Sequence, residues 1–166
     1  MKQKELSIWL KGIVIVCAGF GAVMAAVLMP QFALYISYAY PVMDKLMPYW
    51  YLFIALTGII FYIGLLYIWL ICNDIAADNS FSIANSNRLK VLSRLALLEA
   101  LLYMIACVIF AAISISNTSL QETDMWVLAI GIFVIFVAII VTIIMASLSH
   151  LVEKAAILKE DSDLTV

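Results

Sequence analysis

Four long stretches of the sequence contain no Asp, Glu, Lys, Arg or His, and they cover residues 12–43, 46–73, 100–121 and 125–149. Each is longer than the roughly 20 residues that an α-helix needs to cross about 30 Å of hydrocarbon. The chain is 67% hydrophobic and only 12% charged, about half the charged fraction of a typical soluble domain. These residues cannot supply the polar coat of a soluble protein, so the sequence predicts a protein whose solvent is a lipid bilayer.

The predicted fold class is all-α, a polytopic membrane protein with four transmembrane helices in an antiparallel bundle. Barrel strands would alternate apolar and polar residues, whereas the run VIFVAIIVTIIMA (134–146) does not. We expect a single domain over residues 1–166. Its parts are spans at 12–36, 49–72, 95–116 and 125–148, a loop at 73–94 and a tail at 149–166.

The basic residues predict the orientation of the chain. Eight of the nine Lys and Arg residues fall in the N-terminal flank, the 73–94 loop or the tail, which share one side of a four-pass arrangement. Loops rich in Lys and Arg stay in the cytoplasm. We therefore expect both termini and the 73–94 loop to be cytoplasmic.

The longest internal polar stretch is DNSFSIANSNRLKVLSRL (78–95). Ser82 is a candidate N-cap whose hydroxyl can accept a hydrogen bond from the N–H of Asn85. The helix that begins there is expected to continue into the third span. Two interpretations remain open. The polar residues cap this helix and anchor it against anionic lipid, or they form a docking surface for a cytoplasmic partner.

The tail continues the fourth span with a helical apolar pattern. Leu148, Leu151, Val152, Ala155 and Leu158 follow the i, i+3, i+4, i+7 spacing of one helix face. This face can pack on the 82–94 segment, lie on the membrane or bind a protein. The acidic residues near the C-terminus favour solvent over the membrane surface.

Glu99 is the one acidic residue inside a predicted span. Tyr103 lies four residues further along the same helix face, and Thr142 reaches a similar depth in the fourth span. A charge in hydrocarbon is costly. Glu99 therefore either forms a hydrogen bond between helices or extends its carboxylate to the inner membrane boundary. The alternative is that it serves with Tyr103 and Thr142 as a proton- or cation-responsive site.

The sequence has no Ser/His/Asp set, no Gly-rich phosphate loop and no metal-ligand spacing. We therefore expect neither an enzyme, a cofactor nor a metal. The pair Gly21 and Ala25 has the small-xxx-small spacing that lets helices approach closely. It predicts packing within this chain, with a homo-oligomer as the alternative.

Two segments resemble a family of small bacterial four-pass membrane proteins that carries a domain-of-unknown-function label. The first is DIAADNSFSIANSNRL (74–89), and the second is LVEKAAILKEDSDLTV (151–166). A departure is Ala77-Asp78, where Gly or Asn is commoner in the family. The matching residues are Phe81, Ser82, Asn85, Arg88 and Leu89 in the first segment, and Asp163, Leu164 and Thr165 in the second.

The resemblance implies a protein of the bacterial cytoplasmic (inner) membrane. Members are often encoded beside a Cro/CI-type helix-turn-helix regulator, which implies an integral membrane regulatory protein that binds or restrains such a transcription regulator. The matching residues would then contact this partner, and the chain itself would not bind nucleic acid. Two alternatives are a small transporter, channel or immunity-type protein, and a structural subunit of a larger membrane complex.

Overall fold

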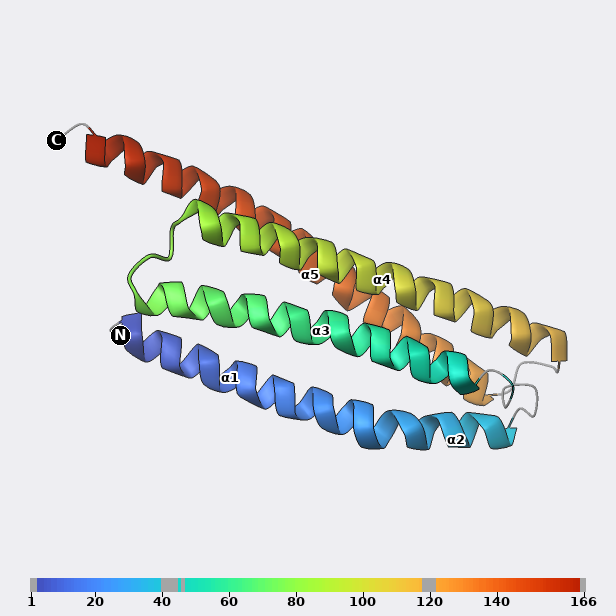
Figure 1. Cartoon of the computed structure of the whole chain (residues 1–166). Coiled ribbons are helices and arrows are strands. Elements are labelled where there is room, and N and C mark those ends of the chain that lie inside the picture. The colour runs from blue at the N-terminus through green and yellow to red at the C-terminus, as the bar shows by residue number, and fades with distance from the viewer. Residues whose placement is uncertain (1–2, 40–44, 46, 118–121, 165–166) are drawn as a thin grey trace. The chain divides into compact units, whose positions relative to one another are not determined.

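The computed structural model describes residues 3–39, 45, 47–117 and 122–164. The secondary-structure elements within these residues are all helical (Figure 1). The predicted all-α class is therefore confirmed. The elements are α1 (Gln3–Val23), η1 (Met24–Leu28), α2 (Met29–Ala39), α3 (Met47–Ala76), α4 (Ile83–Asn117) and α5 (Glu122–Leu164).

Four helical stretches of the described chain are long and apolar enough to cross a membrane. Many of their large apolar side chains point outward, for example Phe20, which is 64% exposed, and Phe133, which is 65% exposed. Water would disfavour this exposure, whereas lipid tails accommodate it. The chain is therefore a multi-pass membrane protein. The stretches are Gln3–Gln31, Met47–Ala76, Ile83–Ile115 and Met125–Ser162.

Two helices extend well beyond the spans that the apolar runs predict. The third predicted span, 95–116, lies within α4, which begins at Ile83. The fourth, 125–148, lies within α5, which continues to Leu164. The expectation that the polar segments before the third span and after the fourth are helical is confirmed.

Contacts between residues divide the chain into two compact units, Met1–Ser80 and Phe81–Val166, and each is described by itself. In the first unit, α3 packs against α1, η1 and α2. In the second, α4 and α5 form a helical hairpin and pack along each other (Figure 1). Each unit thus pairs two successive spans.

The first span contains a widened turn, η1, between α1 and α2. The N–H of Met29 donates to the carbonyl of Met24, five residues earlier, which is the spacing of a π-helix. Pro30 follows immediately. A proline has no N–H, and in an α-helix its ring would collide with the carbonyl four residues earlier. The wider turn before Pro30 lets the helix continue without that collision.

Close contacts join α1 to α3 in the first unit. The Tyr62 hydroxyl donates to the carbonyl of Ala18 over 2.8 Å. A Cβ added at Gly21 would lie 2.7 Å from the Phe61 ring. The ring can therefore pack against α1 at this position only because glycine has no side chain. Gly21 therefore contributes to packing within this chain, as its spacing predicts.

The N-terminal part of α1 is also tied to the end of α3. The Ser7 hydroxyl, which is buried, donates to the carbonyl of Cys72 over 2.6 Å. The Lys11 ammonium lies 5.3 Å from the centre of the Trp69 ring, a favourable cation–π distance. The amide of Gln3 donates to the Asp78 carboxylate over 2.5 Å.

The helix α3 ends in a Schellman motif. The N–H of Asn79 donates to the carbonyl of Asp74 over 2.9 Å, and the N–H of Asp78 donates to the carbonyl of Ile75 over 3.2 Å. This motif places the residue after the helix in the left-handed region, and Asp78 has φ 60°. Gly or Asn adopts that conformation more easily than Asp.

The helix α4 begins with the N-cap that the sequence predicts. The N–H of Asn85 donates to the Ser82 hydroxyl over 3.2 Å, and the N–H of Ser86 donates to the Ser82 carbonyl over 3.1 Å. Ser82 thus satisfies N–H groups that have no partner within the helix. The predicted cap is confirmed.

Substitution of Ser82 by alanine is expected to lower the free energy of unfolding by about 1 kcal/mol, because the N-cap hydrogen bond is lost. Titration with SDS in mixed micelles, followed by circular dichroism, measures this change. Ser82→Asp is the control, since aspartate also caps helices and should keep the wild-type stability. An equal loss in both variants would show that the cap is not the cause.

Candidate functional site

The polar segment at the start of α4 packs against α5, and the packed part is called the stem here. The stem comprises residues 83–94 of α4 and 142–153 of α5. At its centre the Ser86 hydroxyl donates to the carbonyl of Ser149 and the Ser149 hydroxyl donates to the carbonyl of Ser86, each over 3.0 Å. Ser86 is 0% and Ser149 is 1% exposed, so this reciprocal pair is fully enclosed.

Two further contacts join the helices in the stem. The Ser93 hydroxyl donates to the carbonyl of Thr142 over 3.0 Å. The Lys90 ammonium lies 3.0 Å from a carboxylate oxygen of Glu153. Small hydroxyl side chains let two helices approach closely and still satisfy their own polar atoms. The polar segment therefore holds the hairpin together at this end.

Sequence reasoning missed Ser86 and Ser149 as the centre of this contact. A usable signal was present, because Ser86 and Ser93 are seven residues apart on α4, and Thr142 and Ser149 are seven apart on α5. Seven residues are two helical turns, so each pair lies on one face. Matching pairs of small polar residues on successive spans indicate a hydrogen-bonded helix interface.

The first set of predicted partner-binding residues divides between buried and accessible positions. Phe81 is 58% exposed, whereas Ser82 is engaged in the cap. Asn85 is only 1% exposed and accepts a hydrogen bond of 2.8 Å from the Arg88 guanidinium. Arg88 and Leu89 are half-buried. Phe81 is therefore the member of this set that a partner can reach most directly.

The second set lies at the C-terminus. The helix α5 continues through Asp163 and ends at Leu164. The side chains of Asp163 and Leu164, and all of Thr165, lie outside the described residues. Their predicted role stays a prediction.

The predicted intramembrane polar set consists of Glu99, Tyr103 and Thr142, and the structure gives these residues different surroundings. The Thr142 hydroxyl donates to the carbonyl of Ala138 in its own helix over 2.8 Å, a common arrangement for threonine in helices. Glu99 is half-buried, and one of its carboxyl oxygens is enclosed without a hydrogen-bond partner. Tyr103 lies one turn beyond Glu99 on α4 and is also half-buried.

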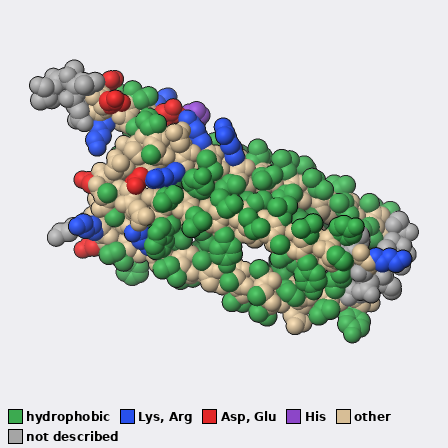
Figure 2. Space-filling model, in the orientation of Figure 1, with side chains coloured by type: hydrophobic (Ala, Val, Ile, Leu, Met, Phe, Trp, Pro, Cys, Tyr) green, Lys and Arg blue, Asp and Glu red, His purple; other side chains and the backbone are tan. Residues whose placement is uncertain are grey.

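Charged side chains mark the end of α5. The upper left of Figure 2, where Figure 1 places the C-terminal end of α5, carries acidic and basic side chains. Lys154, Lys159, Glu160 and Asp161 are exposed there. This part of α5 therefore has the surface of a helix in water.

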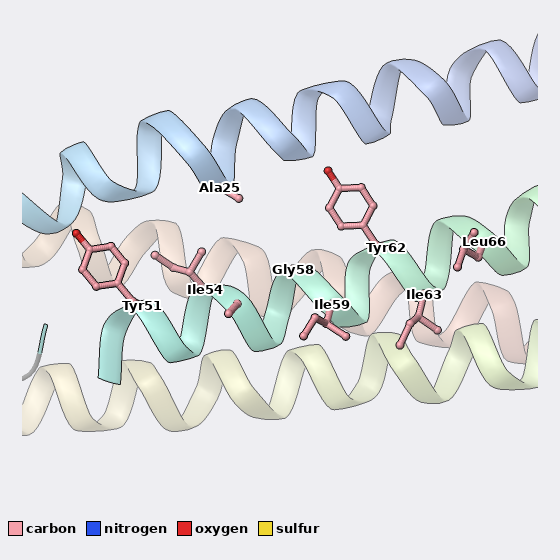
Figure 3. Close-up of a pocket in the computed structure, with 9 residues that line it drawn as sticks. Ala25, Tyr51, Ile54, Gly58, Ile59, Tyr62, Ile63 and Leu66 are labelled. Carbon is pink, nitrogen blue, oxygen red and sulfur yellow. The ribbon is translucent and has the colours of Figure 1, made fainter. Parts of the chain in front are cut away.

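A shallow hollow of about 460 Å³ lies in the first unit, between η1 and α3. Ala25, Gly58 and Ala55 are small and leave the space open, and Tyr51 and Tyr62 lie at its edge. Figure 3 shows both tyrosine rings rising from α3 towards the segment that carries Ala25. Its lining is almost entirely apolar, so it offers little for binding a polar molecule.

Within the described residues, no three His, Cys, Asp or Glu side chains lie close enough together to hold a metal ion. Cys17, Cys72 and Cys107 are free thiols.

Residues 15–166 match a family model described as a protein of unknown function (DUF2975). Neither the curated proteins nor the solved structures contain a match.

Proposed function

We propose that this chain, which belongs to the DUF2975 family of proteins of unknown function, is a membrane-anchored interaction protein that binds a cytoplasmic partner through the stem and the tail. The partner class that the resemblance of its two signature segments implies is a small helix-turn-helix transcription regulator. The four apolar helices would hold the binding surface at the membrane.

The observation that carries this proposal is the length of α5. The helix continues from the predicted end of the fourth span, near Leu148, to Leu164, which at 1.5 Å per residue is about 24 Å of helix. The stem supports the base of this extension through Ser86, Ser149, Lys90 and Glu153. A supported helix with a charged surface is suited to presenting a docking site.

The proposal requires the stem and the tail to lie in the cytoplasm. The distribution of Lys and Arg supports that orientation. A tag at either terminus should therefore stay unlabelled when intact cells are probed from outside. Labelling of the C-terminal tag from outside the cell would contradict the proposed function.

Site-specific photocrosslinking in cells tests for the partner. A photoreactive phenylalanine analogue placed at Phe81, which is 58% exposed, should cross-link to a soluble protein, which mass spectrometry then identifies. The matched control is the same analogue at Phe133, which is 65% exposed but lies within the fourth span. We expect a soluble protein at Phe81 and none at Phe133.

Other results of the same experiment favour other functions. Cross-links to a different membrane protein at Phe133, with none at Phe81, would indicate a structural subunit of a membrane complex. Cross-links to a second copy at Phe133 would indicate a homo-oligomer. Absence of any soluble protein at Phe81 would contradict the proposed function.

A transporter is the second candidate, because Glu99 has an enclosed carboxyl oxygen without a hydrogen-bond partner in a membrane-spanning helix. Acidic residues in spans often mark ion or proton pathways. Purified protein in liposomes would then show a proton or cation flux that Glu99→Gln reduces. Lack of flux across a range of pH would exclude this candidate.

A further inference from the structure

An apolar stripe with three exposed leucines and the half-buried Ala155 lies on the outer side of α5. It consists of Leu148, Leu151, Ala155 and Leu158 and is called the tail stripe here. Leu151 is 63% and Leu158 is 68% exposed. The intervals of three, four and three residues are those of the a and d positions of a coiled coil. Such a stripe fits one side of a second helix.

The geometry of α5 turns this stripe away from the buried side of the helix. Ser149 is 1% and Ala156 is 9% exposed, so they mark that buried side. Leu151 comes two residues after Ser149, and Leu158 comes two residues after Ala156. Two residues rotate a helix by about 200°, which places both leucines nearly opposite. Val152, which the sequence pattern groups with them, is half-buried instead.

The charges beside the tail stripe indicate the chemistry of its partner. Lys154 precedes Ala155 and Lys159 follows Leu158, so they occupy the g and e positions on the two sides of the stripe. Both are exposed. Glu153, by contrast, lies away from the stripe and pairs with Lys90. The exposed Asp161 occupies the next g position, beyond Leu158. The basic pair therefore flanks the part of the stripe from Leu151 to Leu158, and a helix that docks there is complementary when acidic residues flank its own apolar stripe.

A second copy of this chain is a poor occupant. Copies in one membrane have the same orientation, so their α5 helices would pair in parallel. In parallel pairs a g residue faces the e residue five positions further along the other helix. Lys154 of each copy would then face Lys159 of the other, and this repulsion would occur twice.

An anionic membrane surface is also a poor occupant. Residues 150–162 contain three acidic residues, Glu153, Glu160 and Asp161, and two basic ones, Lys154 and Lys159. A helix that lies on anionic lipid usually carries a basic polar face. Ala156 is still buried at about 12 Å along the helix from Leu148, so α5 remains packed well beyond the predicted span.

We propose that the tail stripe binds an amphipathic helix of a partner protein, with apolar residues against Leu151 and Leu158 and acidic residues beside Lys154 and Lys159. This inference rests on the proposed function and specifies the element by which the partner docks. It specifies α5 as a docking element of the contact surface formed by the stem and the tail.

A binding experiment with defined peptides tests this inference. The full chain is placed in nanodiscs of zwitterionic lipid and titrated against two fluorescent helical peptides, both with Leu at a and d. One has Glu at e and g and the other has Lys there. Fluorescence anisotropy should show saturable binding of the Glu peptide and at least about tenfold weaker binding of the Lys peptide, because opposite and like charges face Lys154 and Lys159.

Three variants complete the test. Leu158→Asp should abolish binding of the Glu peptide, and the double variant Lys154→Glu, Lys159→Glu should prefer the Lys peptide. Ile157→Asp is the matched control, since Ile157 is 47% exposed but lies about 100° from Leu158. The inference is wrong if the Glu peptide and the Lys peptide bind with equal affinity, or if charge reversal leaves the preference unchanged. It is also wrong if Ile157→Asp and Leu158→Asp weaken binding of the Glu peptide to the same extent.

A fluorescence measurement tests the lipid alternative directly. An environment-sensitive fluorophore is attached at Leu158→Cys in a chain whose three native cysteines are replaced by alanine. Its emission should be the same in anionic and zwitterionic nanodiscs. A shift to the blue in anionic nanodiscs would assign the tail stripe to the membrane surface and overturn the inference.

Failure of this inference is distinguishable from failure of the proposed function. If Phe81 cross-links to a soluble protein and that protein is retained by the double charge-reversal variant, the proposed function stands and the inference fails. If the peptides behave as expected but no soluble protein is cross-linked in cells, the stripe is a helix-binding surface and the proposed function fails.

Discussion

Substitution of Ser149 by leucine is expected to lower the free energy of unfolding by about 3 kcal/mol. The leucine side chain would enter a space in which Ser149 is only 1% exposed, and overpacking of this kind costs about 1–3 kcal/mol. The hydroxyl that donates to the carbonyl of Ser86 would also be lost, which adds about 1 kcal/mol. Titration with SDS in mixed micelles measures the difference.

The control for this prediction is Ser147→Leu. Ser147 lies on the same helix two residues earlier and is exposed, so the same change there should alter stability by less than about 0.5 kcal/mol. The distance between Lys90 and Glu153 depends on the separation of the two helices. This distance should therefore increase in Ser149→Leu and stay unchanged in Ser147→Leu. Equal stability of Ser149→Leu and Ser147→Leu would show that the stem does not hold α4 and α5 together.

Substitution of Gly131 by alanine is the second change with a large expected effect. In an exposed helix this exchange usually stabilises by about 1 kcal/mol. At Gly131, however, an added Cβ would collide with the sulfur of Cys107 on α4. We expect a net loss of about 2 kcal/mol in the free energy of unfolding, because the two helices must separate or Cys107 must change its rotamer.

A double variant isolates this contact. Cys107→Ala removes the sulfur, so Gly131→Ala should cost little in that background, and the two changes should be strongly non-additive. Gly58→Ala is the matched control on α3, because an added Cβ there meets no atom within 4 Å. Destabilisation by Gly131→Ala that persists without the Cys107 sulfur would contradict the proposed close contact.

The four spans were predictable because the length of an apolar run is a property of the sequence alone. No soluble alternative accommodates residues such as Phe20 and Phe133, which remain exposed in the folded chain. The Ser82 cap was predictable for a related reason, since its acceptor and the Asn85 N–H are only three residues apart. Both predictions depend only on residues that are close together in the sequence.

The stem was not predictable in detail, because its contacts join residues 49 to 63 positions apart, as in Ser93 with Thr142 and Ser86 with Ser149. Asn85 shows the difficulty most clearly. A polar residue outside a predicted span reads as surface, yet Asn85 is 1% exposed and bonded to Arg88. Composition cannot distinguish a polar residue that meets water from one that meets a neighbouring helix.

The hydroxyl-to-carbonyl contacts of the stem have a consequence for bilayers of different thickness. Ser93 meets α5 at Thr142, within the predicted fourth span, and Ser86 meets it at Ser149, just past its end. Both contacts use the same donor and acceptor types and depend little on whether hydrocarbon or headgroups surround them. One mode of helix pairing therefore continues across the predicted end of the span, and the Lys90–Glu153 ion pair, which hydrocarbon would disfavour, limits how far a thicker bilayer can enclose the stem.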